Sequence, residues 1–187
     1  MRINSIKKWL KDLDYNRKLS LLFFLCFFVF AQIAAILISG AVFDTVKIIS
    51  HAKIPYGIVY IDYDYAEPEA ADVGIPYLIE NKGIYNLDKV VLTVNLKVNY
   101  IDYSTKNNVT LKFFHKTENL GDCRPNSNLY GFLHGGYESF NTTLFDYFID
   151  NSDPDELYWI LGDFEIKARY FFQLIKFIIK MQDIKLL

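Results

Sequence analysis

The stretch from Leu21 to Phe43 carries no charged residue, and it constrains the fold more than any other part of the sequence. As an α-helix it would rise about 34 Å, which exceeds the hydrocarbon thickness of about 30 Å in a typical bilayer. A buried core helix of this length would normally show a polar face. The sequence therefore predicts a membrane-spanning helix over residues 19–43.

The charges on the two sides of this stretch differ in sign. Residues 1–18 hold six Lys and Arg against two Asp, whereas residues 19–187 hold 14 basic against 20 acidic residues. By the positive-inside rule, the N-terminus is expected in the cytoplasm and the C-terminal domain outside. Because Ser39-Gly40-Ala41 resembles a cleavage site, a cleaved signal peptide is the alternative, but the apolar stretch exceeds the usual ~7–15 residues. We expect an uncleaved signal anchor that crosses the cell membrane once.

Residues 1–18 form a basic segment with apolar positions at helical spacing. Ile3, Ile6, Leu10 and Leu13 recur at intervals of three and four residues, with lysines between them. The pattern fits either an amphipathic helix at the cytoplasmic lipid interface or a basic tail that only sets the topology.

Residues 57–187 are predicted to form one mainly β extracytoplasmic domain, after a linker over residues 44–56. The chain contains 14 Tyr and 16 Phe, and aromatic residues favour strands. The clearest signal is the alternation from Val90 to Tyr100, which predicts a strand with one buried and one wet face. Further strands are expected over residues 57–62, 73–81, 109–116 and 137–149, and as one long bulged strand from residue 164 onward.

Turn-forming residues separate these strands. The triplet Asn81-Lys82-Gly83 predicts a turn in which Gly83 can take a positive φ, and Thr105-Lys106-Asn107 suits a hairpin. Residues 117–136 contain four Gly and are predicted to be a loop. Asp153-Pro154 predicts the start of one short helix that ends near Gly162. For residues 170–181 an amphipathic helix is the alternative to a strand.

Two groups of residues are candidates for metal binding or catalysis. Five carboxylates fall between Asp62 and Asp72, but the calcium-loop pattern of alternate ligands and a turn Gly is broken, so a solvated acidic loop is the default and calcium the alternative. His115, Cys123 and His134 offer a thiol and two imidazoles, yet neither C-x-x-C nor H-x-x-x-H spacing is present. We expect no catalytic residue, no cofactor and no metal site.

Two further features depend on the outer location of the domain. Asn108 and Asn141 each begin an N-x-[ST] triplet and are possible glycosylation sites. Cys26 lies in the membrane stretch, which leaves Cys123 without an intramolecular disulfide partner outside.

An N-terminal anchor is followed here by IPYLIENKGIYNLDKVVLTVNLKV, then GYESF and a final long strand. This order resembles the membrane-anchored β-sandwich proteins of archaea related to the water-stress and hypersensitive-response domain of late embryogenesis abundant proteins. In that family a strand ends in Asn near a turn and leads into a long alternating strand. Here Asn81 corresponds to the Asn, and Val90–Tyr100 correspond to the alternating strand. The usual Asn-Pro pair is absent, because Lys82 follows Asn81. The resemblance covers residues 55–185 and implies an immunoglobulin-like antiparallel sandwich of about seven strands with Greek-key links and no active site.

Two classes of function fit these expectations. The first is a non-catalytic surface protein whose outer sandwich contacts an envelope protein, a glycan or another copy of itself. The second is an outer-face hydrolase or metal-dependent enzyme that uses the acidic loop or the group of His115, Cys123 and His134. An accessory subunit of a membrane complex is a third possibility, with Gln32 or the small residues Ala31, Ala34 and Ala35 making helix contacts. The lipid bilayer is an expected partner, whereas the acidic outer domain argues against nucleic acid.

Overall fold

The computed structural model describes residues 14–49, 52–64, 66–152 and 157–186. The chain separates into two units, Met1–Gly40 and Ala41–Leu187. Helix α2 (Tyr15–Ile49) contains the segment Tyr15–Phe43, which is long and apolar enough to cross a membrane, a property that signal sequences share. Within the predicted linker over residues 44–56, helix α2 continues to Ile49. Of the predicted basic segment, residues 1–13 lie outside the described residues.

The first sheet, sheet A, is built around β3 (Asp72–Asn81). Strand β6 (Ser127–Gly135) pairs along one edge of β3, from Val73↔Gly135 to Asn81↔Ser127. The two short strands β1 (Ala52–Lys53) and β2 (Tyr60–Asp62) pair in turn along its other edge. All of these pairings are antiparallel.

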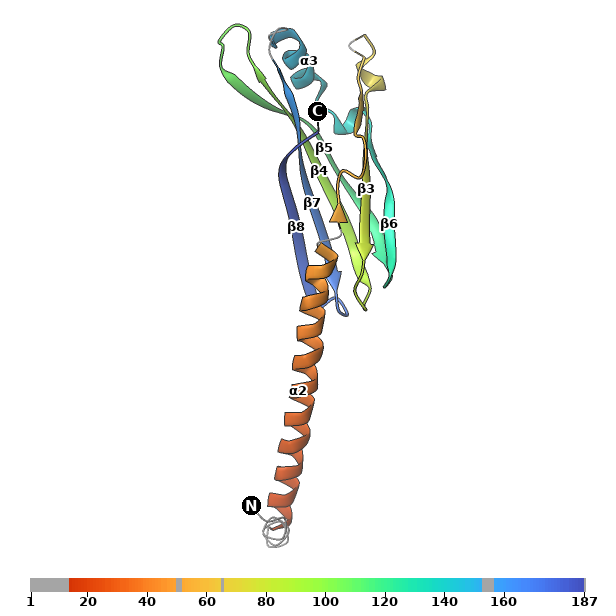
Figure 1. The fold of residues 1–187 in the computed structure, drawn as a ribbon, viewed down its shortest axis with the longest axis vertical. Coiled ribbons are helices and arrows are strands. Elements are labelled where there is room, and N and C mark those ends of the chain that lie inside the picture. The colour runs from red at the N-terminus through yellow and green to blue at the C-terminus, as the bar shows by residue number, and fades with distance from the viewer. Residues whose placement is uncertain (1–13, 50–51, 65, 153–156, 187) are drawn as a thin grey trace. The chain divides into compact units, whose positions relative to one another are not determined.

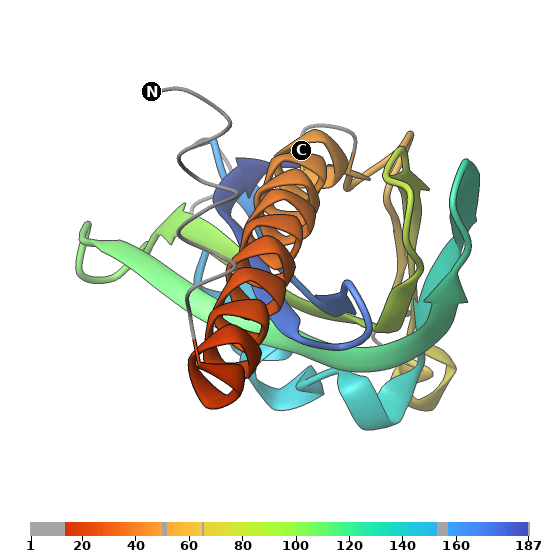
Figure 2. The same ribbon diagram turned by 90° about the horizontal axis from the view of Figure 1, so that it is seen from below.

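The second sheet, sheet B, has the order β5-β4-β7-β8 and is also antiparallel. Its strands are β4 (Leu87–Ile101), β5 (Asn108–Cys123), β7 (Trp159–Tyr170) and β8 (Ile175–Lys185). The two sheets face each other as a β-sandwich (Figures 1 and 2). The predicted fold class, a mainly β sandwich with an N-terminal apolar helix and a short second helix, is confirmed.

The core lies between the sheets and follows the predicted alternation. In β4 the inward side chains Val90, Leu92, Val94, Leu96, Val98 and Tyr100 are all buried. Val73, Ile75 and Ile79 of β3 and Leu133 of β6 face them from sheet A. Packing between these two sets of side chains removes apolar surface from water. Each Å² of apolar surface buried in this way stabilises the folded state by roughly 25 cal/mol.

The sandwich has two distinct ends (Figure 1). At the end that we call the turn end, three turns over residues 82–86, 124–126 and 171–174 come together. The buried Asn81 joins two of them, because its Nδ2 donates to the carbonyl oxygens of Tyr85 at 2.9 Å and Cys123 at 2.8 Å. At the opposite end, the α3 end, helix α3 (Thr142–Asn151) lies beside the β4–β5 turn, where the Tyr103 N–H donates to the Asn151 carbonyl at 2.8 Å.

The prediction of a loop over residues 117–136 is wrong. Strand β5 runs to Cys123 and β6 begins at Ser127, so only residues 124–126 form a turn. One of the glycines that suggested a loop, Gly135, has a packing role instead. A Cβ on Gly135 would lie 2.6 Å from the ring of the buried Phe114, which requires a residue without a side chain at this position.

The predicted strand over residues 137–149 is also wrong. The segment forms a 3-10 turn, η2 (Tyr137–Ser139), and then α3. Asn141 caps this helix, with its side chain accepting from the Leu144 N–H at 3.1 Å. Phe145 and Phe148, three residues apart on one helix face, turn into the core and decide in favour of a helix.

The C-terminal segment is a hairpin rather than one bulged strand or a helix. The chain reverses over residues 171–174, where Phe171, Phe172 and Gln173 all have positive φ, and β8 returns beside β7 with the register Tyr170↔Ile175. The change in apolar phase that suggested a bulge comes from this reversal. Of the short helix predicted from Asp153, residues 153–156 lie outside the described residues and Trp159 already begins β7.

Two smaller predictions also need correction. The strand predicted over residues 57–62 is confined to Tyr60–Asp62, and β1 lies within the predicted linker. Gly83 does not adopt the positive φ that glycine allows. A Cβ on Gly83 would lie 2.1 Å from the Tyr170 hydroxyl, so the absence of a side chain at this position makes room for that hydroxyl.

Candidate binding site

The outer side of sheet A carries exposed aromatic residues. Strand alternation turns Val73, Ile75 and Leu133 inward, and the residues between them outward. On this outer side Tyr130 is 76% exposed and Phe132 is 52% exposed. Together with Tyr56 and Tyr60, which lie along the opposite edge of β3, they form what we call the aromatic face.

Backbone contacts with β3 fix the two tyrosines. The Tyr56 N–H donates to the Pro76 carbonyl at 2.8 Å, and Tyr60 is in register with Gly74. The Tyr60 ring lies over Gly74, where a Cβ would come within 2.0 Å of Cε1. The absence of a side chain at Gly74 therefore allows Tyr60 to reach across β3.

Hydrogen bonds hold the Tyr60 hydroxyl at one end of the aromatic face. It donates to Asp72 Oδ2 at 2.9 Å and lies 3.0 Å from His134 Nδ1. Partial burial, and then the neighbouring Asp72 carboxylate, raise the pKa of Tyr60 above its usual range. The phenol is therefore protonated at neutral pH and serves as a donor.

A groove of about 520 Å³ runs over the other end of the aromatic face. Its apolar walls come from Tyr56, Pro76, Tyr130 and Phe132, and its polar groups are Glu80 and Asn128. Glu80 also pairs with Lys82 at 3.4 Å. The groove thus offers aromatic rings flanked by hydrogen-bonding side chains, an arrangement typical of binding sites.

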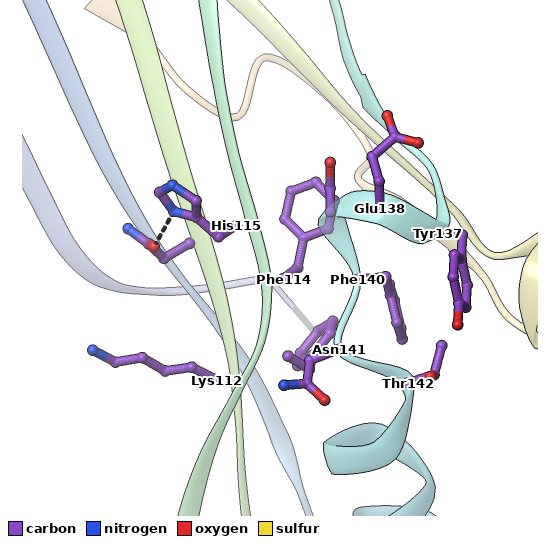
Figure 3. Close-up of a pocket in the computed structure, with 11 residues that line it drawn as sticks. Lys112, Phe114, His115, Tyr137, Glu138, Phe140, Asn141 and Thr142 are labelled. Atoms are coloured by element: carbon purple, nitrogen blue, oxygen red, sulfur yellow. Dashed lines mark hydrogen bonds between the residues drawn. The ribbon is translucent and has the colours of Figure 1, made fainter.

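A second hollow of about 580 Å³ lies between β5, η2 and the start of α3. His115, with its Nδ1 2.7 Å from Asn95 Oδ1, and Lys112 stand on the β5 side, whereas Tyr137 and Glu138 project on the other side (Figure 3). Lys116 lies 3.6 Å from Glu138. Because the titratable groups do not converge on one point, the geometry assigns no reaction to this hollow.

The structure does not bring His115, Cys123 and His134 together. His115 is on the outer side of sheet B, and His134 is on the outer side of sheet A beside Tyr60. Cys123 is buried at the turn end, with its Sγ 3.5 Å from Ser127 Oγ. Within the described residues, no group of three or more His, Cys, Asp and Glu is placed to hold a metal ion, and this includes the acidic residues between Asp62 and Asp72.

The two sequons are accessible but differ in their surroundings. Asn108 is the exposed first residue of β5. Asn141 is also exposed, but its side-chain oxygen caps α3. Occupancy at either residue stays a prediction.

Sequence reasoning missed the aromatic face. Tyr130 and Phe132 lie in the segment that was predicted to be a loop, and both residue types suit the core as well as the surface. The signal that was present is the alternation of Gly131, Leu133 and Gly135 with larger residues. Only the pairing of β6 with β3 shows which set points outward.

No protein-family profile matches this chain, and no curated protein matches it. Among solved structures, one similar chain is Spo0M, a sporulation control protein from Bacillus subtilis, with 6% sequence identity and a TM-score of 0.31. The match covers 72% of this chain and 49% of the other, so this chain spans about half the length of that structure. What the fold itself defines is a class: a two-sheet antiparallel β-sandwich preceded by a helix that is able to anchor in a membrane.

Proposed function

We propose that this chain is a single-pass membrane-anchored, non-catalytic binding protein that holds a glycan on the aromatic face of its outer β-sandwich. The length and composition of Tyr15–Phe43 support the anchor. The six basic residues before the apolar stretch support a cytoplasmic N-terminus and an outer sandwich.

The observation that carries the proposal is the exposure of Tyr130 and Phe132 on the outer side of sheet A, beside Tyr56 and the groove. A sugar ring has an apolar C–H face and a rim of hydroxyl groups. The aromatic rings can stack on the apolar C–H face of a sugar. The side chains of Glu80, Asn128 and the Tyr60–His134 pair can form hydrogen bonds with its hydroxyl groups. The surface of an envelope protein or of a second copy of the chain would match this combination of aromatic rings and hydroxyl-binding groups less closely than a glycan does.

The same geometry supports binding rather than catalysis. Binding needs only a surface, whereas catalysis needs titratable groups that converge on a reacting atom. The separate positions of His115, Cys123 and His134 argue against the enzyme alternative.

The test uses the full chain in detergent on an array of immobilised oligosaccharides. We expect wild-type binding to weaken about tenfold, equivalent to ~1.4 kcal/mol, with Tyr130→Ala or Phe132→Ala. Tyr103→Ala removes a comparably exposed ring at the α3 end and should leave binding unchanged. Absence of wild-type binding, or equal loss in all three variants, would contradict the proposal.

We also propose that the chain belongs to the archaeal branch of the late embryogenesis abundant domain family and has an immunoglobulin-like sandwich. The residues that motivate this proposal are Asn81 and Val90–Tyr100. The support is the order of the anchor, the Asn-terminated strand and the long alternating strand. In addition, Asn81 is buried and holds the β3–β4 turn.

A further inference from the structure

Large apolar side chains project from the turn end of the sandwich. Ile84 is 67% exposed, Phe172 is 76% exposed and Leu174 is 74% exposed. They belong to the β3–β4 and β7–β8 turns, which are held together by Tyr85, whose ring centre lies 5.6 Å from that of Phe172. Ile84, Phe172 and Pro125 border a shallow hollow of about 230 Å³. Three segments distant in sequence therefore present one apolar tip.

The backbone of the β7–β8 turn is strained in a way that exposes this tip. Phe171, Phe172 and Gln173 have φ of 52°, 52° and 65°, although none is a glycine. Left-handed backbone is sterically unfavourable for an L-residue, because Cβ approaches the following carbonyl oxygen. The turn places Phe171 in the core and Phe172 in the open. Strain that leaves an aromatic ring exposed suggests that the ring has a use outside the domain.

Basic residues surround the apolar tip. Those at or near the turn end are Lys82, Lys89, Arg124, Arg169 and Lys176, against the carboxylates Glu80, Asp88 and Asp122. A hollow of about 400 Å³ on the outer side of sheet B is lined by three of these bases together with Lys167 and Ile178. The turn end is therefore positive as well as apolar.

The α3 end has the opposite charge. Among the described residues it carries nine carboxylates: Asp62, Asp64, Glu67, Glu69, Asp72, Asp102, Glu138, Asp146 and Asp150. The bases at this end are fewer: Lys106 lies in the β4–β5 turn and Lys185 is the last residue of β8. The two ends of the sandwich therefore differ in charge, the turn end being net positive and the α3 end net negative. A domain surrounded by water on all sides does not need such a difference.

The chain connection between the apolar span and the sandwich is short. From Phe43, where the apolar span ends, the helix runs to Ile49 and β1 begins at Ala52, a distance of at most about 20 Å. Ala52 pairs with Ile79, only two residues before β3 ends at the turn end. At about 3.4 Å per residue, β1 is therefore roughly 7 Å from the turn end and roughly 24 Å from the start of β3.

We propose that the turn end is a second membrane contact, in which Ile84, Phe172 and Leu174 enter the headgroup region of an anionic lipid surface. Lys89, Arg169 and Lys176 lie where they can pair with lipid phosphates. An apolar tip with basic flanks is the pattern by which peripheral segments bind anionic bilayers. This inference rests on the membrane anchoring proposed above, but not on the aromatic face or its ligand.

The experiment places a nitroxide label at one position at a time in the full chain, reconstituted in vesicles. The variants Phe172→Cys and Leu174→Cys report on the tip, Tyr103→Cys on the α3 end and Phe28→Cys on the anchor. The background carries Cys26→Ala, while Cys123 is 1% exposed and protected. Accessibility to oxygen, which enters lipid, is compared with accessibility to a water-soluble nickel chelate, in phosphatidylcholine vesicles with and without phosphatidylglycerol.

We expect the labels at positions 172 and 174 to lose nickel-chelate accessibility and gain oxygen accessibility relative to position 103, more strongly in the anionic vesicles. The triple variant Lys89→Glu, Arg169→Glu, Lys176→Glu should abolish that dependence on lipid charge. If positions 172 and 174 match position 103 in both vesicles while position 28 is in lipid, the inference is overturned and the anchor stands. If position 28 is itself in water, the proposed anchoring fails as well.

Discussion

Asp102 closes the β4–β5 turn with a single oxygen. Its Oδ1 accepts from the Ser104 hydroxyl at 2.7 Å, the Thr105 N–H at 2.7 Å, the Thr105 hydroxyl at 2.9 Å and the Ser104 N–H at 3.0 Å. These bonds, above all the one from the Ser104 side chain, lower the pKa of Asp102 below its usual range. The turn that presents Tyr103 therefore depends on an ionised carboxylate.

The pH dependence of this turn can be measured. Because the folded-state pKa of Asp102 is lowered, its contribution to stability is present above the unfolded-state pKa of about 3.9 and is lost as the pH falls through the folded-state value. Asp102→Asn should therefore unfold at lower urea concentration than wild type at neutral pH, and the difference should shrink under strong acid. Urea titrations of the full chain in detergent test this. A difference that does not change with pH would contradict it.

Two adjacent glycines make a matched pair at the end of β6. A Cβ on Gly135 would lie 2.6 Å from the ring of Phe114, whereas a Cβ on Gly136 would have the Ala71 carbonyl at 3.6 Å as its neighbour. Gly135→Ala should lower the free energy of unfolding by about 1–3 kcal/mol through overpacking. Gly136→Ala, with an ordinary negative φ, should change it little. Denaturant unfolding of both variants checks the prediction, which fails if their effects are equal.

At the scale of elements, α3 shows why a strand prediction failed. Thr, Phe and Tyr favour strands, and residues 137–149 are rich in them. Packing decided otherwise, because Phe145 lies 4.8 Å from Phe113 and Phe148 lies 5.1 Å from Tyr100, measured between ring centres. Local propensity is worth only tenths of a kcal/mol per residue, and the burial of two phenylalanines outweighs it.

The cap of α3 can be tested separately from its sequon. Asn141→Ala removes the acceptor for the Leu144 N–H and should cost about 1 kcal/mol of unfolding free energy. Asn141→Asp keeps an acceptor and should remain close to wild type. Both variants destroy the N-x-[ST] triplet, so glycosylation does not confuse the comparison. Equal destabilisation in unglycosylated protein would show that the cap is not the cause.

Strand β4 shows what local sequence can decide. From Val90 to Tyr100 every second residue is apolar, and each of these is buried. Strand β6 was missed because its glycines suggested a loop, and because its outer side carries the aromatic Tyr130 and Phe132 where a solvated face would carry polar residues. Alternation then gives no contrast, and only pairing with β3 distinguishes the two sides.

At the scale of the whole molecule, charge predicts topology. Residues 1–18 are net basic and the rest of the chain is net acidic. A protease-sensitive tag after Leu187 should therefore be digested in intact cells, while a tag before Met1 should be protected. Immunoblotting of both tagged proteins measures this. Protection of the C-terminal tag would reverse the topology and remove the sequons and an outer glycan from consideration.

The sequence by itself determined the apolar helix, the mainly β class and the alternating core strand, because each depends on a pattern that is local along the chain. It also determined the sign of the net charge on each side of the apolar helix. Tertiary structure alone decided the full lengths of strands β5 and β6, helix α3 and the C-terminal hairpin. It also assembled the aromatic face and the turn end, since both join residues far apart in the chain. These features depend on which side of a strand is covered, and that is fixed only when the two sheets pack.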